Sequence, residues 1–331
     1  MSILSRRDAA RLSLSAAATA LLPAAAGAQG TFPDRPITFV VPYGAGGPFD
    51  LIARVVAERM RQDLGRPVVV ENRAGAGGII GCASVARAPA DGYTILLGGL
   101  TTHILMQGAV ETLPFDPIGD FAVASLLSKT PLILAANKDL PVTDLASLVA
   151  LLKASPGRYT FASAGNGTSG HVVTQYLVDA VGAEALHVPY RTSAQATTDL
   201  LTGRIDFMVK TTAEAEPMRN GSIRPLVIFS DTRAPALPDV PTLAETGFNN
   251  VVRYNLEPWQ AIMVRRGTPD AIVARLNQAV AATAADPATR RRFEESNLVP
   301  FAGSVADGEA YFVAENTRWV PIVRGMGLIG R

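Results

Sequence analysis

Short apolar runs alternate with helix-length amphipathic segments along this chain, and glycine-rich turns separate many of them. Residues 37–41 have the composition of a buried strand, and in 51–64 the apolar residues recur at helical spacing until Gly65, which stands at a C-cap position. A strand at 68–70 and a short helix at 79–86 follow. This alternation predicts the α/β fold class, with mostly parallel sheets.

The same alternation continues to the middle of the chain, and the residues after Pro269 are mostly helical. The further elements expected are strand 94–97, helix 144–154, strand 159–163, helix 172–180, strand 186–189, helix 195–201 and strand 205–209. A length of 331 residues with 48% apolar residues favours two domains.

The first 28 residues have the pattern of a removable targeting segment. Arg6, Arg7 and Arg11 precede the apolar stretch 12–26, which is too short and too interrupted to span a bilayer. The run 5–8 resembles a twin-arginine export signal, and the general secretory route remains an alternative. We expect cleavage after Ala28 and a periplasmic mature protein.

Charge and cysteine content narrow the classes of partner. Removal of residues 1–28 changes the formal net charge from +1 to −1, which makes nucleic acid an unlikely partner class. Cys82 is the single cysteine, so an intramolecular disulfide is impossible and a small buried side chain is expected. The three histidines share no metal-ligand spacing, and no metal or cofactor is predicted.

Two glycine-rich loops, 43–50 and 163–171, each lie between an expected strand and an expected helix. Ligands of open α/β sheets bind beyond the carboxyl ends of strands, where helix N-termini present backbone N–H groups that favour anions. Glycine lets a ligand approach the backbone, and Ser, Thr and Asn side chains add neutral donors. These loops therefore predict a site for a carboxylate that is bound and released again.

Long motifs in this chain resemble the substrate-binding receptors of tripartite tricarboxylate transporters, also called Bug-type receptors. The motifs cover essentially the whole mature chain. They are Pro36-Ile37, Val41-Pro-Tyr-Gly-Ala-Gly-Gly47 with Asp50, Val68-Val-Val-Glu-Asn-Arg-Ala-Gly-Ala-Gly-Gly78, Pro89-Ala-Asp-Gly-Tyr93, Tyr159-Thr-Phe-Ala-Ser-Ala-Gly-Asn-Gly-Thr-Ser169 with His171, His187-Val-Pro-Tyr190 and Pro235-Ala-Leu-Pro-Asp-Val-Pro-Thr242.

The resemblance implies a periplasmic-binding-protein (Venus flytrap) fold, with two α/β domains joined by two crossover segments and a ligand cleft between them. The crossovers are expected near 127–131 and 229–231, so that domain 1 comprises 29–128 plus 231–331 and domain 2 comprises 129–230. The receptor is expected to be a monomer that binds a small carboxylate and delivers it to membrane permease subunits.

The predicted ligand-binding set combines the two loops with residues suggested by the resemblance. Its members are Tyr43, Gly44, Ala45, Gly46, Gly47, Phe49, Asp50, Thr101, Ser163, Ala164, Asn166, Gly167, Thr168, Ser169, His171, Lys210 and Trp259. Asp50 is also expected to cap its helix, since an N-cap aspartate accepts backbone N–H bonds.

Three departures from the family pattern bear on the cargo. Pro48 and Phe49 stand where the family usually has a Ser or Thr pair, and Lys210 follows an expected strand where the family often has an acidic residue. The segment 249–259, with Arg253 and Tyr254, is also unusual. We expect Lys210 to meet a second anionic group and Phe49 or Trp259 to cover an apolar or aromatic body, and a solvated surface lysine is the alternative.

Two enzyme classes compete with the receptor. The order strand, Gly-Ala-Gly-Gly, helix, strand and Glu71 imitates the dinucleotide-binding unit of an exported NAD(P)-dependent oxidoreductase, but Phe49 occupies the position of the third glycine. A serine hydrolase would need Gly-x-Ser-x-Gly, and His171 stands at the final glycine of the nearest match. A sensor that reports its ligand to a signalling partner would use the same cleft as a transport receptor.

Overall fold

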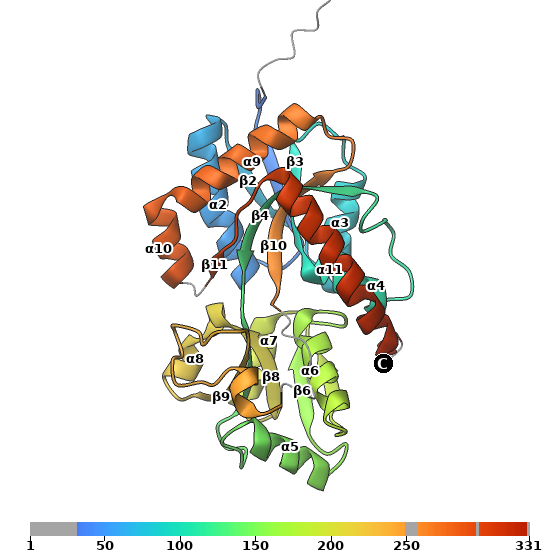
Figure 1. Ribbon diagram of the computed structural model, residues 1–331, viewed down its shortest axis with the longest axis vertical. Coiled ribbons are helices and arrows are strands. Elements are labelled where there is room, and N and C mark those ends of the chain that lie inside the picture. Colours follow the sequence, from blue (N-terminus) through green and yellow to red (C-terminus); the bar gives the residue numbers. More distant parts are fainter. Residues whose placement is uncertain (1–31, 249–256, 296–297, 330–331) are drawn as a thin grey trace, which may run out of the picture. The chain divides into compact units, whose positions relative to one another are not determined.

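The computed structural model describes residues 32–248, 257–295 and 298–329, and the compact unit that carries the site begins at Arg35. The predicted targeting segment lies outside the described residues, as do Arg253 and Tyr254. Two α/β domains, each built on a mixed sheet, make up the compact unit (Figure 1). Within the described ranges, no helix is both long and apolar enough to cross a bilayer.

The larger sheet has six strands in the order β11-β4-β10-β3-β1-β2. Their bounds are β1 Ile37–Val41, β2 Val68–Asn72, β3 Thr94–Gly99, β4 Phe121–Lys129, β10 Trp259–Arg265 and β11 Val299–Pro300. β1 pairs in parallel with β2 and β3, whereas β10 runs antiparallel to β3 and β4. The carboxyl ends of β1 and β3 therefore lie at one edge, next to the start of β10.

Helices cover the larger sheet because their apolar faces match its buried strands. They are α2 Pro48–Leu64, α3 Ile79–Ala86, α4 Met106–Ala109, α9 Asp270–Ala285, α10 Pro287–Glu295 and α11 Val305–Gly325. α2, α9 and α10 pack against one another, and α11 packs against α4 and β4 (Figure 1). The C-terminal helices thus belong to the domain that contains the N-terminal strand.

The smaller sheet has five strands in the order β7-β6-β8-β5-β9. Its strands are β5 Leu132–Asn137, β6 Thr160–Ser163, β7 Leu186–Pro189, β8 Phe207–Thr211 and β9 Ile223–Phe229, and its helices are α5 Leu145–Ala154, α6 Ser169–Ala180, α7 Ser193–Leu201 and α8 Glu216–Arg219. β6 is parallel to β7 and β8, and β5 is antiparallel to β8 and β9.

Two details of the expected secondary structure were wrong. The sheets are mixed instead of mostly parallel, because the strands that enter and leave each sheet through a crossover run against their neighbours. Lys210 does not follow its strand but lies within β8, opposite Ile133 of β5. The predicted C-cap at Gly65 is confirmed, since its φ is 67° and its N–H donates to the carbonyl of Arg61.

The chain passes from the larger to the smaller sheet between Lys129 and Leu132. The segment after β9 still packs on the smaller sheet, because Thr242 bridges to Ile228 and Leu237 joins its apolar core. The domain bounds 29–128 plus 231–331 and 129–230 stay a prediction, and this packing favours a later second boundary, after Thr246.

Candidate functional site

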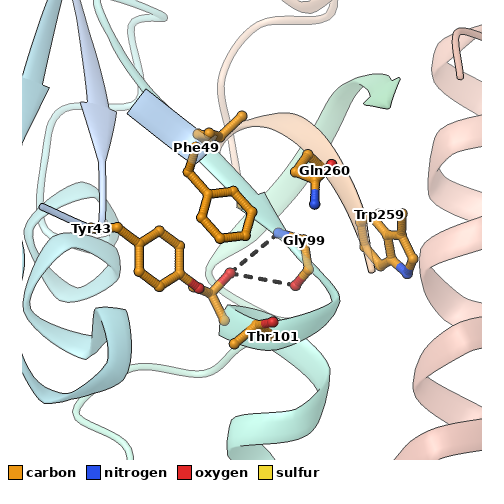
Figure 2. Close-up of a pocket in the computed structure, with 9 residues that line it drawn as sticks. Tyr43, Phe49, Gly99, Thr101, Trp259 and Gln260 are labelled. Atoms are coloured by element: carbon orange, nitrogen blue, oxygen red, sulfur yellow. Dashed lines mark hydrogen bonds between the residues drawn. The ribbon is translucent and has the colours of Figure 1, made fainter. Parts of the chain in front are cut away.

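A narrow pocket lies at the carboxyl ends of β1 and β3, where the predicted carboxylate site was placed (Figure 2). Its lining combines two aromatic rings, hydroxyl groups, an amide and backbone. The lining residues are Tyr43, Phe49, Leu97, Gly98, Gly99, Thr101, Thr102, Trp259 and Gln260. Among these described residues none has a charged side chain, so the pocket offers neutral donors and apolar surface.

Tyr43 and Phe49 form one wall of the pocket. Their rings are stacked, with centroids 4.5 Å apart and an interplanar angle of 21° (Figure 2). Burial raises the pKa of Tyr43 above its ordinary value, and a hydrogen bond with Thr101 opposes this shift. The phenol is therefore protonated at neutral pH, and Phe49 adds an apolar surface where a hydroxyl-bearing residue would add donors.

The loop before α2 is held in shape by Asp50. The backbone N–H of Gly46 donates to Asp50 Oδ2 over 2.9 Å, and Asn72 Nδ2 donates both to Asp50 Oδ1 over 3.0 Å and to the carbonyl of Tyr43 over 3.1 Å. Burial opposes ionisation, but hydrogen bonds from Arg54, Gly46 and Asn72 outweigh it and lower the pKa of Asp50. The N-cap position is Gly47, so the expectation that Asp50 is the N-cap residue was wrong. Asp50 lies in the first helical turn and braces the loop from there.

The second loop, between β6 and α6, meets the pocket through a hydroxyl pair. Thr101 Oγ1 and Ser169 Oγ lie 2.5 Å apart, and both side chains are buried. Thr168 Oγ1 donates to the carbonyl of Gly165 over 2.7 Å, which folds the loop back on itself. The structure thus joins Thr101, a lining residue, to the N-terminus of α6.

The helices that follow the two loops begin without a side-chain cap. Gly47 at the start of α2 has no side chain, and the Thr168 side chain at the start of α6 accepts no hydrogen bond from the first turn of its helix. α9 also begins without a side-chain cap, whereas Asp144, Thr192 and Ser304 cap α5, α7 and α11. The first N–H groups of a helix have no partner within the helix and carry partial positive charge. Uncapped first turns leave those donors to an anion.

The buried His171 and the partly buried His187 support the second loop through hydrogen bonds. His171 and His187 stack with ring centroids 3.9 Å apart, and His171 Nδ1 accepts the Gly167 N–H over 3.1 Å. His187 Nε2 lies 2.7 Å from Ser163 Oγ. Burial lowers the pKa of His171 to about 4, and burial together with His171 lowers the pKa of His187 to about 3. Ser163 and His187 resemble a nucleophile and its base, but a histidine with so low a pKa is a weak base.

Close backbone approach explains two glycines near the site. Gly167 has a φ of +73°, and a Cβ there would lie 2.7 Å from Ala109 Cβ and 2.9 Å from Met106 Sδ. Gly77 has a φ of +66°, and a Cβ there would come within 3.3 Å of the Asn166 carbonyl oxygen. The second loop therefore fits against the end of α4 only because these positions have no side chain.

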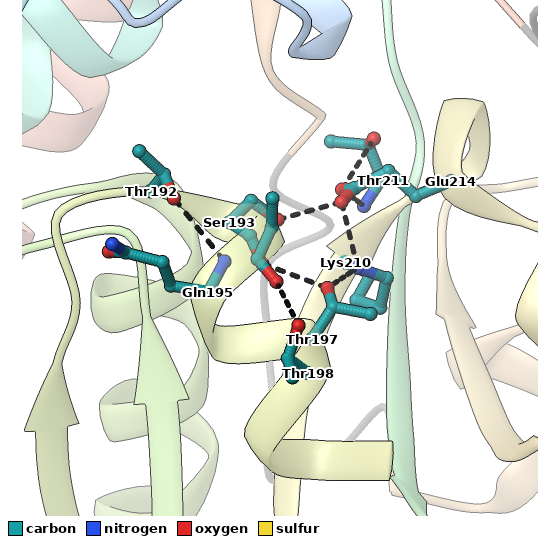
Figure 3. Close-up of polar contacts among 9 residues, drawn as sticks. Thr192, Ser193, Gln195, Thr197, Thr198, Lys210, Thr211 and Glu214 are labelled. Carbon is teal, nitrogen blue, oxygen red and sulfur yellow. Dashed lines mark hydrogen bonds and ion pairs between the residues drawn. The ribbon is translucent and has the colours of Figure 1, made fainter.

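Lys210 is not brought to the pocket. Its Nζ donates to Glu214 Oε1 over 2.7 Å and to Thr197 Oγ1 over 2.6 Å, and its side chain is 1% exposed (Figure 3). Glu214 Oε1 also accepts a bond from Ser193. The expectation that Lys210 meets an anionic group of the ligand is therefore corrected, because an internal carboxylate already neutralises this ammonium.

Trp259 contributes to the pocket lining, and a hydrogen bond to α11 fixes its indole ring. Its indole Nε1 donates to Glu315 Oε2 over 3.1 Å, and Figure 2 shows the ring turned toward α11. Glu71, the acid of the dinucleotide-type pattern, accepts hydrogen bonds from Arg73, the shortest of 2.6 Å. Glu71 would have to lose this partner before it could bind a ribose. The bond to Glu315 leaves the Trp259 ring in the pocket lining, and its contact with a ligand stays a prediction.

Apart from Thr101, the predicted set missed the lining residues at the end of β3, and in β10 it missed Gln260. Gly99 is the last residue of β3, Thr102 follows that strand, and Gln260 lies in β10. The run 98–102, with two glycines followed by a leucine and two threonines after a strand, is the same kind of signal as the two loops that were recognised. Gln260 gave no local signal, because β10 joins the sheet from the far end of the chain.

Residues 52–328 match the family described as the tripartite tricarboxylate transporter family receptor. The chain belongs to this family. The periplasmic binding protein BugD is similar, with 31% identity and a TM-score of 0.83 over 90% of this chain and 99% of that one. Rpa4515 of R. palustris, solved with adipate, has 33% identity and a TM-score of 0.83 over 89% and 98%. MatC from Rhodopseudomonas palustris, with bound malate, has 31% identity and a TM-score of 0.82 over 88% and 100%.

Membership of this receptor family confirms the Bug-type resemblance and the periplasmic-binding-protein fold. The family is one of periplasmic solute-binding receptors, and two similar receptors were solved with small dicarboxylic acids. The individual ligand contacts remain predictions for this chain.

Proposed function

We propose that this receptor captures a small organic carboxylate or dicarboxylate, aromatic acids included, and delivers it to the membrane permease subunits of a tripartite tricarboxylate-type transporter. We further propose that it is exported, that its targeting segment is removed near Ala28, and that it works as a monomer without enzymatic activity. The observation that carries this proposal is the 2.5 Å contact of Thr101 and Ser169, which brings the uncapped start of α6 to the pocket.

The chemistry of the two loops supports an anionic ligand that is released again. The first turns of α2 and α6 supply backbone N–H groups, and Thr101, Ser169 and Tyr43 supply hydroxyls. Hydrogen bonds to a charged acceptor are stronger than neutral ones, and neutral donors add no fixed charge that would hold the ligand permanently. The adipate bound by Rpa4515 and the malate bound by MatC are anionic carboxylates of the kind that such donors would bind.

Titration calorimetry of the protein without residues 1–28 tests the proposal. Adipate, malate and benzoate are compared with adipamide and benzamide, which keep the shape but lose the charge. We expect at least one acid to bind with a dissociation constant in the micromolar range or below, while its amide does not bind. Binding of NAD(P) with no response to any acid would contradict the proposal and favour the oxidoreductase.

A second experiment separates transport from sensing, since both would use the same cleft. Membranes that contain the permease subunits are incubated with the liganded protein, and its retention is compared with that of the ligand-free protein. We expect ligand-dependent retention by those membranes. Equal retention by membranes that lack the subunits would contradict the transport role.

A further inference from the structure

Gln260 lies at the middle of the larger sheet and is aimed into the pocket. It belongs to β10, pairs with Gly99 of β3 and is 2% exposed. Its Oε1 accepts hydrogen bonds from Ser128 Oγ over 2.8 Å and from Thr130 Oγ1 over 3.2 Å. Both lone pairs of the amide oxygen are thereby used, which fixes the direction of the amide group.

The other end of the same amide is open. The Gln260 Nε2 carries two N–H donors, neither of which has a protein partner among the described residues, and Figure 2 shows the amide beside Gly99 in the pocket. Gln260 Nε2 is not among the buried, unpartnered side-chain atoms of the described residues, so its open donors are accessible from the pocket. An oriented amide with an open donor in the pocket is therefore a binding group for an acceptor from outside the protein.

The surroundings define what kind of acceptor fits. Tyr43 and Phe49 present a stacked apolar wall, and Leu97 adds an aliphatic one. No described lining residue is charged, and the buried ammonium of Lys210 is already paired with Glu214. Transfer of a second carboxylate into such surroundings costs several kcal/mol without a cation to offset it, whereas a neutral oxygen needs only one donor.

The shape of the sheet makes room for this contact. A Cβ on Gly99 would lie 3.2 Å from Gln260 Cα and would overlap the Trp259 carbonyl oxygen. The absence of a side chain at this position lets β3 approach β10 closely and leaves space beside the Gln260 amide. The same strand pair thus sets both the position of the donor and the open space in front of it.

We propose that Gln260 is a selectivity residue, and that the cargo is an organic acid whose apolar body carries a neutral oxygen acceptor, such as an ether, carbonyl or hydroxyl, that accepts from Gln260 Nε2. This inference rests on the proposed carboxylate-receptor function and narrows its cargo. The acid group binds at the two loops, the body lies against Phe49, and the neutral oxygen reaches the amide.

Titration calorimetry with two matched series of acids tests the proposal. The first series is benzoate, its 3- and 4-methoxy and 3- and 4-hydroxy derivatives, and its 3- and 4-carboxy derivatives. The second is hexanoate, 6-hydroxyhexanoate and adipate. In at least one series we expect a derivative with a neutral oxygen to bind about tenfold more tightly than the parent acid and more tightly than the dicarboxylate.

The variant Gln260→Met should reduce the ratio of the two affinities, derivative over unsubstituted parent acid, from about tenfold to about one. Gln260→Glu keeps the acceptor for Ser128 and Thr130 but replaces the donor, so it should also lose the preference. Gln107→Met is the control, because Gln107 Nε2 already donates to the His103 carbonyl and to Asn316. We expect this control to retain the preference.

Two results would overturn the selectivity role. One is an equal loss of affinity for parent and derivative acids in Gln260→Met, which would mark a structural residue. The other is tightest binding of a dicarboxylate in both series. In either case acids still bind to the wild-type protein. Absence of binding by every acid in both series would instead refute the receptor function on which the inference rests.

Discussion

At the scale of single residues, the buried ionisable groups of this receptor are neutral or internally paired. The three histidines of the chain are all buried or partly buried, and burial lowers the pKa of each, to about 3 for His103, about 4 for His171 and about 3 for His187. Lys210 is neutralised by Glu214. Burial therefore keeps the histidines uncharged, and the charge of Lys210 is balanced by Glu214 within the protein.

The histidines make stability depend on pH in a calculable direction. An unfolded histidine has a pKa of about 6.5, so below this pH the unfolded chain binds more protons than the folded one, and the free energy of unfolding falls as the pH falls toward about 4. Each histidine contributes about 1.4 kcal/mol per pH unit within that window. In His187→Gln we expect the histidine part of the slope to fall by roughly one third.

Urea unfolding at several pH values between about 7.5 and 5 measures this slope for wild type and variant. The glutamine can still bond to Ser163, so the loop has a substitute partner for the lost ring. An unchanged slope would show that His187 takes up its proton at the same pH in the folded protein as in the unfolded chain, contrary to the effect of its burial.

The Lys210–Glu214 pair makes a second prediction at this scale. Removal of one member of a buried ion pair leaves the other uncompensated, and such losses amount to about 3–5 kcal/mol. Because Glu214 keeps partial exposure, 20% of its side chain, we expect Lys210→Met to lower the free energy of unfolding by about 3 kcal/mol, at the low end of that range.

The double variant Lys210→Met with Glu214→Gln is the matched control, because it removes both charges. It should recover much of the lost stability in chemical denaturation, and calorimetry of either variant should show ligand affinity within about threefold of wild type. A large loss of affinity in both variants at unchanged stability would restore Lys210 as a ligand contact.

At the scale of elements, the site is formed by three turns that each leave a strand and enter a helix. β1 leads to α2, β3 to the π-helical turn Leu100–Leu105, and β6 to α6. The carboxyl ends of neighbouring parallel strands meet at one sheet edge, so residues 58 or more positions apart in sequence, such as Tyr43 and Thr101, share a pocket. The position of each turn depends on how closely its backbone can pack against neighbouring residues.

Gly167 provides the test of that dependence. In Gly167→Ala the new Cβ would lie 2.7 Å from Ala109 Cβ, which belongs to the short helix α4 and has no flexible end to move. The loop must shift, and with it the start of α6. We expect the affinity for a bound acid, measured by calorimetry, to fall by at least about tenfold.

Gly182→Ala is the matched control for backbone strain. Gly182 also has a positive φ, +64°, but a Cβ there would meet nothing within 4 Å. This variant should lose about 1 kcal/mol of stability, the cost of a Cβ in the left-handed region, with unchanged affinity. Equal effects of the two substitutions on affinity would contradict the role of close approach at Gly167.

At the scale of the whole molecule, the larger sheet is completed by strands from a distant part of the chain, whereas the strands of the smaller sheet all lie between residues 132 and 229. β10 inserts between β3 and β4, and α11 returns to pack on β4. The two domains are therefore not independent in sequence. The sheet of the larger domain is complete only when the C-terminal third of the chain, with β10 and β11, has been synthesised. We therefore expect this chain to be exported as the complete protein together with its targeting segment.

The export proposal predicts a processed periplasmic protein whose first residue is Gln29. Mass spectrometry of the periplasmic fraction would measure this terminus, and a change of Arg6 and Arg7 to lysine should retain the precursor in the cytoplasm if the twin-arginine route is used. Normal export of the lysine variant would show that the general secretory route carries the receptor instead.

The sequence by itself determined the α/β class, the receptor family and the two glycine loops, because these depend on local periodicity and on contiguous motifs. The antiparallel strands β4, β5, β9 and β10 were not predicted, since a buried apolar run has the same appearance whichever direction its neighbours take. Only the tertiary structure decided that Lys210 is neutralised by Glu214 and that Gln260 faces the pocket. The charge and direction of a buried side chain depend on partners that the fold brings from elsewhere in the chain, and Ser128 and Thr130 lie some 130 residues before the amide that they orient.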